Sequence, residues 1–272
     1  MAALGALARV SHAQWCNAFA ASGALTFPLL FFVSAPYGKH HRAGWGRAVS
    51  GRAGWFVQEI ISPVTLLAAF YAAQARALPP GAALPWWAPS PVHVFLLLWC
   101  LHYAHRAVLY PLQRHMSATT VPVVATAVAF NLVNGALVGS ELAAAATTRF
   151  ADWNALAAPR VLAGLALMAL GAAVNISSDA TLRSLRAKTP GDKSYYVPRG
   201  GLFEYVACPH YAGEVVEWTG FALATATHSG AVFAFWTFAN LAPRAVTTRQ
   251  WYRSKFREEY PRSRKALIPF IF

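Results

Sequence analysis

Seven long apolar stretches constrain what this chain can fold into. They cover residues 12–34, 54–76, 91–112, 120–146, 156–178, 203–226 and 229–248. Each comes close to the roughly 20 apolar residues that an α-helix needs to cross the hydrocarbon core of a bilayer. Only 12% of the residues are charged, whereas a soluble domain usually has about 25%. The sequence therefore predicts an all-α, multi-pass membrane protein folded as a seven-transmembrane-helix bundle.

The positions of the basic residues predict how this bundle is oriented. Most of the 23 Lys and Arg residues fall in the loops 35–53 and 179–202, at the end of the third stretch, and in the tail after residue 244. Since Lys and Arg concentrate on the cytoplasmic side, we expect the N-terminus outside and the C-terminus in the cytoplasm. The same rule accounts for the net charge of +13, so no nucleic-acid partner is expected. The first stretch continues past its small residues without a cleavage pattern, which indicates a helix rather than a removed signal peptide.

The chain shows no repeat, linker or metal motif. We therefore expect one domain, residues 1–272. We also expect a monomer, located in a bacterial cell membrane or in the endoplasmic reticulum membrane. Cys16, Cys100 and Cys208 are scattered among apolar residues, so neither disulfides nor a metal framework is predicted. His210 and Glu214 have a spacing that a metal site could use, but no third ligand with a defined spacing accompanies them, and no metal is expected.

Two polar groups inside the predicted spans call for an explanation. Gln58 and Glu59 lie within the second span, and the sequence "LHYAHR", which contains Tyr103 and Arg106, lies toward the cytoplasmic end of the third. Because neighbouring spans run antiparallel, we expect Glu59 at the depth of Tyr103. Intramembrane acids usually line a cavity or pathway; the alternative is that Glu59 pairs with Arg106 and only holds two helices together.

A second polar set faces the predicted cytoplasmic side. Guanidinium groups bind phosphates, and carboxylate or amide groups bind ribose hydroxyls. The set comprises Asn175, Asp179, Arg183, Arg186, Arg244 and Arg249, with Tyr195, Tyr196 and Tyr252 between them. It favours a phosphate-bearing ligand, although ordinary cytoplasmic basic residues explain most of its charge. No Gly-rich dinucleotide or Walker sequence is present.

Several long motifs resemble a known family. The segments "WFVQEIIS", "CLHYAHR", "NISSDATLRSLR", "YVPRGGLFEYVACPHYAGEVVEWTGFALAT" and "WYRSKFREEYPRSRKALIPFIF" are similar to those of the steroid 5-alpha-reductases, and the resemblance extends from about residue 34 to the end. It implies a seven-helix enzyme that uses NADPH to reduce the Δ4 double bond of a 3-oxo-Δ4-steroid. The steroid would be reached from the bilayer, and membrane lipids are the only other expected partners.

The resemblance also implies roles for individual residues. Gln58, Glu59 and Tyr103 fall on the steroid-binding positions, with Glu59 and Tyr103 at the 3-oxo group. The cofactor-binding positions fall on Lys39, Arg106, Asn175, Asp179, Arg186, Tyr195, Glu214, Trp218, Arg244 and Tyr252, to which the polar set adds Arg183. His210 stands where vertebrate type-2 members have an asparagine, and Thr248 where they have a histidine. A neutral Glu59 carboxyl and the Tyr103 hydroxyl would both donate to the oxygen that gains negative charge.

Three alternatives stay open at this point. One is a membrane methyltransferase of the isoprenylcysteine carboxyl methyltransferase type, because the segment "CPHY" resembles part of the C-terminal region of those enzymes. Another is a reductase of a different lipid enone. The third is a transporter that uses Glu59 and Glu214 as a relay.

Overall fold

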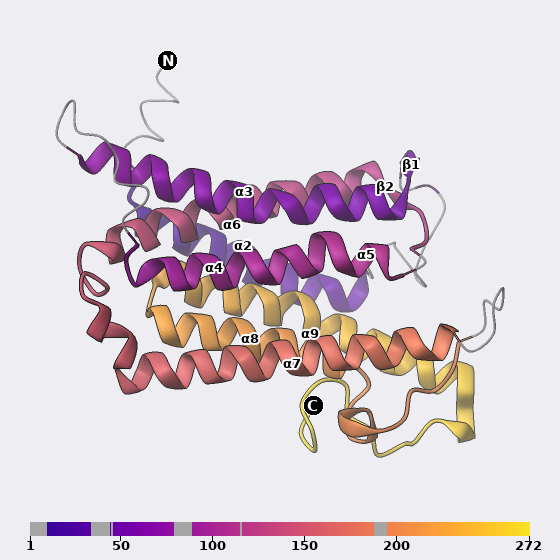
Figure 1. Ribbon diagram of the computed structural model, residues 1–272. Coiled ribbons are helices and arrows are strands. Elements are labelled where there is room, and N and C mark those ends of the chain that lie inside the picture. Colours follow the sequence, from indigo (N-terminus) through magenta and orange to yellow (C-terminus); the bar gives the residue numbers. More distant parts are fainter. Residues whose placement is uncertain (1–9, 34–43, 45, 79–88, 115, 188–194) are drawn as a thin grey trace.

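The computed structural model describes residues 10–33, 44, 46–78, 89–114, 116–187 and 195–272, and there the chain is mainly helical (Figure 1). Within these residues, seven long helices lie side by side. They are α2 (His12–Phe32), α3 (Gly51–Ala77), a continuous segment from α4 (Val92–Tyr103) through a π-helical turn (Ala104–Leu109) to α5 (Tyr110–Leu112), α6 (Val121–Ala146), α7 (Pro159–Ala187), α8 (Pro209–Thr225) and α9 (His228–Phe256). The all-helical prediction is confirmed.

Five of these helices are long and apolar enough to cross a membrane: α2, α3, the α4–α5 segment, α6 and α7. Helix α8 has only 17 residues and α9 is the most polar of the seven, so neither meets the same requirement among the described residues. The seven predicted spans therefore correspond to seven helices, of which five have the composition of a span. The orientation of the termini stays a prediction.

The last three predicted spans differ most from the helices observed. Helix α7 continues nine residues past the predicted end at residue 178. Helix α8 begins at Pro209, six residues later than predicted. Proline suits the first turn of a helix, and the residues before it form other local structure. A 3-10 turn occupies Gly201–Glu204, and Val206 pairs with Lys265 in a parallel bridge. Helix α9 continues eight residues past the predicted end, because charged residues end a span without ending a helix.

Short polar interactions fix the starts of the helices. At α2 the Ser11 and Gln14 side chains accept from each other's backbone N–H groups, which satisfies two donors that a helix start leaves free. The strands β1 (Ala48–Val49) and β2 (Thr119–Thr120) pair antiparallel and join the start of α3 to the start of α6.

Helices α7 and α8 are in backbone contact through glycine. A Cβ atom on Gly171 would lie 2.3 Å from the backbone nitrogen of Glu217, and one on Gly213 would lie 2.6 Å from that of Asn175. Gly164 and Gly220 form the same kind of contact farther along. Small residues allow such close packing. This contact fixes the polar side chains of α7 relative to those of α8.

The C-terminal tail folds back against the start of α8. The Arg264 side chain is fully buried, donates to the Pro198 carbonyl at 2.8 Å and contacts the Glu204 carboxylate at 3.3 Å. The backbone N–H of Gly200 donates to the same carboxylate at 2.6 Å, and this bond, with the Arg264 charge, lowers the pKa of Glu204. The tail is thus attached by a charged network as well as by apolar contacts.

Candidate functional site

Glu59 and Tyr103 come together from α3 and α4. Tyr103 is 5% exposed, and its ring centroid lies 5.6 Å from that of Trp99 and 6.2 Å from that of Trp218. Its side chain interacts with that of Ser62, one turn beyond Glu59 on α3, and with the Glu59 carboxyl. A carboxyl and a phenol therefore share one aromatic-walled region.

Gln58 supports Glu59 in two ways. Its side-chain nitrogen donates to Glu59 Oε1 at 3.2 Å, and its backbone carbonyl accepts from Asn131 Nδ2 at 2.6 Å. Asn131 is a buried residue of α6 that the sequence did not single out. These bonds hold the α3 backbone at this position against α6 and orient the Glu59 carboxyl.

Arg106 connects this region to two other carboxylates. Its guanidinium lies 3.7 Å from Asp179 Oδ2 and 3.4 Å from Glu214 Oε2, so the ion pairs join the π-helical turn to α7 and α8. The same group lies over the rings of Trp55, at 5.0 Å, and Tyr110, at 4.7 Å. Glu59 also interacts electrostatically with Arg106. Among the described residues the ion pairs of Arg106 are with Asp179 and Glu214, and the pairing of Glu59 with Arg106 stays an alternative interpretation.

Asp179 and Glu214 have unused acceptor atoms. Asp179 is 4% exposed and lies between Arg106 and Arg114, with Oδ1 3.4 Å from the Arg114 guanidinium. Within the described part of the chain, neither oxygen of Asp179 accepts a hydrogen bond with good geometry, and the same is true of Glu214 Oε2. Buried acceptors of this kind suit hydroxyl donors. Beside two guanidinium groups, they fit a ligand that carries both phosphates and hydroxyls.

Asn175 links α7 to the first turn of α8. Its side-chain nitrogen donates to the backbone carbonyl of His210 at 2.8 Å, and the side chain is 3% exposed. The His210 ring lies 4.2 Å from the ring of Tyr211. Asn175 thus positions the helix start that carries His210 and, one turn on, Glu214.

Three aromatic residues that the resemblance assigns to a cofactor have packing contacts in the structure. Trp218 is 1% exposed and belongs to the central core cluster. The ring of Tyr252 stacks on that of Tyr260 at 5.4 Å, and Tyr195 meets Trp251 edge-on at 4.8 Å. These contacts fix ring orientations around the candidate site.

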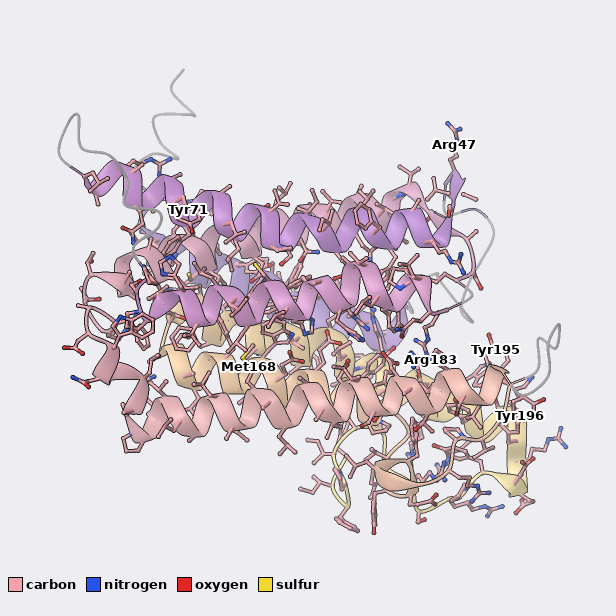
Figure 2. All side chains as sticks on the ribbon, viewed as in Figure 1. Arg47, Tyr71, Met168, Arg183, Tyr195 and Tyr196 are labelled. Carbon is pink, nitrogen blue, oxygen red and sulfur yellow. The ribbon has the colours of Figure 1, made fainter. Side chains whose placement is uncertain are left out.

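The remaining assigned residues lie mostly at one end of the bundle. Figure 2 shows Arg183 and Tyr195 at the end opposite Tyr71, and Arg183 donates to the side chain of Gln113. Arg244 is a partly buried residue of α9. Lys39 and the side chain of Arg186 lie outside the described part of the chain.

A cavity of about 440 Å³ lies between α4 and α7, and neither Glu59 nor Tyr103 is among its lining residues. Its walls are aliphatic, and its polar lining consists of His102, His105, Asn175 and Glu217. His102 Nδ1 lies 2.8 Å from Glu217 Oε1, and Glu217 is 2% exposed. His102 and Glu217 are 115 residues apart in the chain, so the sequence alone did not pair them.

Comparisons with known proteins agree with this architecture. The family model described as "3-oxo-5-alpha-steroid 4-dehydrogenase" matches residues 117–272. The chain is 41% identical over 263 residues to "Steroid 5-alpha-reductase DET2" of Gossypium hirsutum, covering 91% of this chain and 92% of that protein. It is 38% identical over 270 residues to "3-oxo-5-alpha-steroid 4-dehydrogenase 1" of Homo sapiens, covering 99% and 95%.

These similarities extend over nearly the whole chain and include the segments that carry Glu59, Tyr103, Arg106 and Glu214. They do not favour the methyltransferase alternative. The chain therefore belongs to the 3-oxo-5-alpha-steroid 4-dehydrogenase family, the steroid 5-alpha-reductases, which are oxidoreductases acting on CH–CH groups.

Proposed function

We propose that this protein uses NADPH to reduce the Δ4 double bond of a 3-oxo-Δ4-steroid. The observation that carries the proposal is the meeting of Glu59 and Tyr103 beside the cluster of Arg106, Asp179 and Glu214. The names of the relatives support the substrate class, since one refers to 5-alpha reduction of a steroid and the other to a 3-oxo-5-alpha-steroid.

The arginine–carboxylate cluster fits the polar parts of the cofactor. Arg106 and Arg114 would bind phosphate, while the unused oxygens of Asp179 and Glu214 would accept from ribose hydroxyls. The further residues assigned to the cofactor are Lys39, Asn175, Arg183, Arg186, Tyr195, His210, Trp218, Arg244 and Tyr252. When bound, NADPH supplies the hydride that adds to C5 of the steroid.

Glu59 and Tyr103 would polarise the substrate. Addition at C5 of a conjugated enone moves negative charge onto the 3-oxo oxygen, so donors aimed at that oxygen lower the barrier. The Tyr103 side chain interacts with that of Ser62, and its hydroxyl can turn to donate to the substrate. A neutral Glu59 carboxyl is the second donor, and Gln58 orients it. Loss of one such donor typically lowers kcat about 10²- to 10³-fold.

The aromatic residues around Tyr103 would exclude water from the reacting carbon atoms. Trp99 and Trp218 are fully buried, and their rings lie 4.8 Å apart next to Tyr103. A dry site strengthens the interaction between a donor and a developing negative charge. The steroid would arrive from the bilayer, where apolar molecules concentrate, and the protein would act as a monomer in a cell or endoplasmic reticulum membrane.

NADPH oxidation by detergent-purified protein, with progesterone as substrate, tests the proposal. We expect steroid-dependent oxidation by the wild type and a loss of about 10²-fold or more in Glu59→Gln and Tyr103→Phe. Tyr71→Phe, about three turns beyond Glu59 on α3, is the matched control and should keep its rate. Binding of NADPH, followed by its fluorescence, should be retained in all three variants.

The outcomes separate the parts of the proposal. If the wild type binds NADPH but does not respond to progesterone, the steroid assignment is wrong and another lipid enone becomes the substrate class. If it binds no NADPH, the cofactor assignment is wrong. If both variants keep full activity, Glu59 and Tyr103 do not polarise the carbonyl.

A further inference from the structure

Three side chains of metal-ligand type gather where α2 begins and α6 ends. This is the end of the bundle opposite β1 and β2 (Figure 1). His12 and Cys16 lie one turn apart on α2, and Glu141 lies on α6. One ligand atom from each residue lies within 4.8 Å of the other two. The group stands apart from the arginine–carboxylate cluster, and the proposed reduction gives it no role.

The hydrogen bonds of His12 direct one ring nitrogen toward Cys16. His12 Nε2 lies 3.0 Å from the carbonyl oxygen of Leu137, which can only accept, so Nε2 carries the proton. The lone pair of Nδ1 then faces Cys16 Sγ at 3.7 Å. A histidine that binds a metal commonly donates its other N–H to a backbone carbonyl in this way.

Glu141 is oriented by the start of α9. Its Oε1 accepts from the backbone nitrogen of His228 at 2.9 Å, and its Oε2 accepts from the backbone nitrogen and hydroxyl of Ser229 at 2.8 and 2.6 Å. Oε1 keeps a lone pair that these bonds do not use. Carboxylates that bind metals are themselves usually hydrogen-bonded, so the support that a ligand needs is already present.

We propose that His12, Cys16 and Glu141 bind one Zn²⁺ ion. Zinc binds thiolate sulfur at about 2.3 Å and histidine nitrogen at about 2.0 Å in tetrahedral geometry, which puts the two ligand atoms roughly 3.5 Å apart. The Sγ–Nδ1 distance of 3.7 Å is close to this value. Thiolate and imidazole ligands together favour zinc over magnesium or calcium. Binding displaces the thiol proton to solvent, and a water molecule takes the fourth position.

Such an ion would join three helices at one end of the bundle. Helix α2 supplies two ligands and α6 the third, while Glu141 also caps α9. Helix α2 packs mainly on α9 and has little contact with α6. The metal would therefore reinforce a weak lateral contact of α2. This site could not be predicted from the sequence, because Glu141 is far from His12 along the chain.

Zinc binding by the full-length protein in detergent tests the proposal. After treatment with a chelator and its removal, Zn²⁺ is titrated in competition with a chromophoric chelator. We expect one ion per chain in the wild type. Affinity should fall at least roughly 10- to 100-fold in Cys16→Ala and in His12→Ala, because each loses a ligand. Cys100→Ala, which removes a different partly buried cysteine, is the matched control and should bind like the wild type.

A second measurement guards against misfolded variants. Because zinc would bind only the folded protein, adding it should raise the Tm of the wild type and of Cys100→Ala, but not that of Cys16→Ala. Equal zinc affinity in the wild type, Cys16→Ala and His12→Ala would show that zinc binds elsewhere and would overturn the proposal. So would a wild type that binds no zinc at micromolar concentrations.

Discussion

Replacing Gly213 by alanine should separate α7 from α8 and disturb the candidate site. The added Cβ would lie 2.6 Å from the carbonyl oxygen of Gly171 and from the backbone nitrogen of Asn175, whereas ordinary contacts begin at 3.4 Å. Both neighbours are backbone atoms, so no side chain can rotate away. The helices must therefore move apart by roughly 1 Å, which already weakens close packing.

The magnitude follows from three opposing effects. Alanine in place of glycine inside a helix contributes about 0.5–1 kcal/mol of stability. Overpacking a close contact costs about 1–3 kcal/mol, and stretching the bond from Asn175 to the His210 carbonyl costs about 1 kcal/mol. The net loss is then about 1–3.5 kcal/mol, which lowers Tm by roughly 2–14 °C for a chain of this size.

Thermal unfolding in detergent, followed by tryptophan fluorescence, measures this loss. Ala166→Val adds more volume on the exposed face of α7 and is the matched control, with a Tm close to that of the wild type. In the proposed reductase, Gly213→Ala should also raise the KM for NADPH, because Asn175 and Glu214 move apart. A variant as stable as the wild type, or more stable, would refute the inference that the two backbones are in contact.

Three further perturbations probe other parts of the molecule. Arg106→Lys should weaken NADPH binding about tenfold or more, measured by fluorescence titration, because lysine lacks the planar group that stacks and pairs with two carboxylates; unchanged affinity would remove Arg106 from the cofactor site. Glu204→Gln should lower Tm at pH 7, since the lowered pKa of Glu204 stabilises the fold above its unfolded pKa of about 4.3. That difference should disappear as the pH falls through the folded pKa, and a pH-independent difference would contradict the role given to the charge. Ala169→Leu should fill part of the cavity between α4 and α7 and leave kcat/KM unchanged, whereas a large loss would put the cavity on the path of the steroid.

The helices could be predicted from the sequence because span length and hydropathy are local properties. The observed bounds of the first four helices lie within a few residues of the predicted ones. The start of α8 could not be predicted, because residues before Pro209 pair with Lys265, near the far end of the chain. The composition also could not separate spans from the more polar α9, which resembles a span only in its first half.

The candidate site was partly foreseeable. Matched depth on neighbouring spans was enough to expect Glu59 near Tyr103. The partners of Arg106 were not foreseeable, because they depend on how α7 and α8 are rotated about their axes. The sequence likewise offered no reason to connect Asn131 to the Gln58 carbonyl, since a buried amide can bond any backbone group within reach.

The π-helical turn at Ala104–Leu109 makes the chain tolerant of the loss of one residue at this point. A π turn holds one more residue than an α-helical turn. Deleting one residue there would restore a regular α-helix and leave the residues beyond it in nearly the same orientation. A deletion in the regular helix before it would instead rotate everything beyond by about 100° and turn Arg114 away from Asp179. Natural variation in length along this helix should therefore occur within Ala104–Leu109.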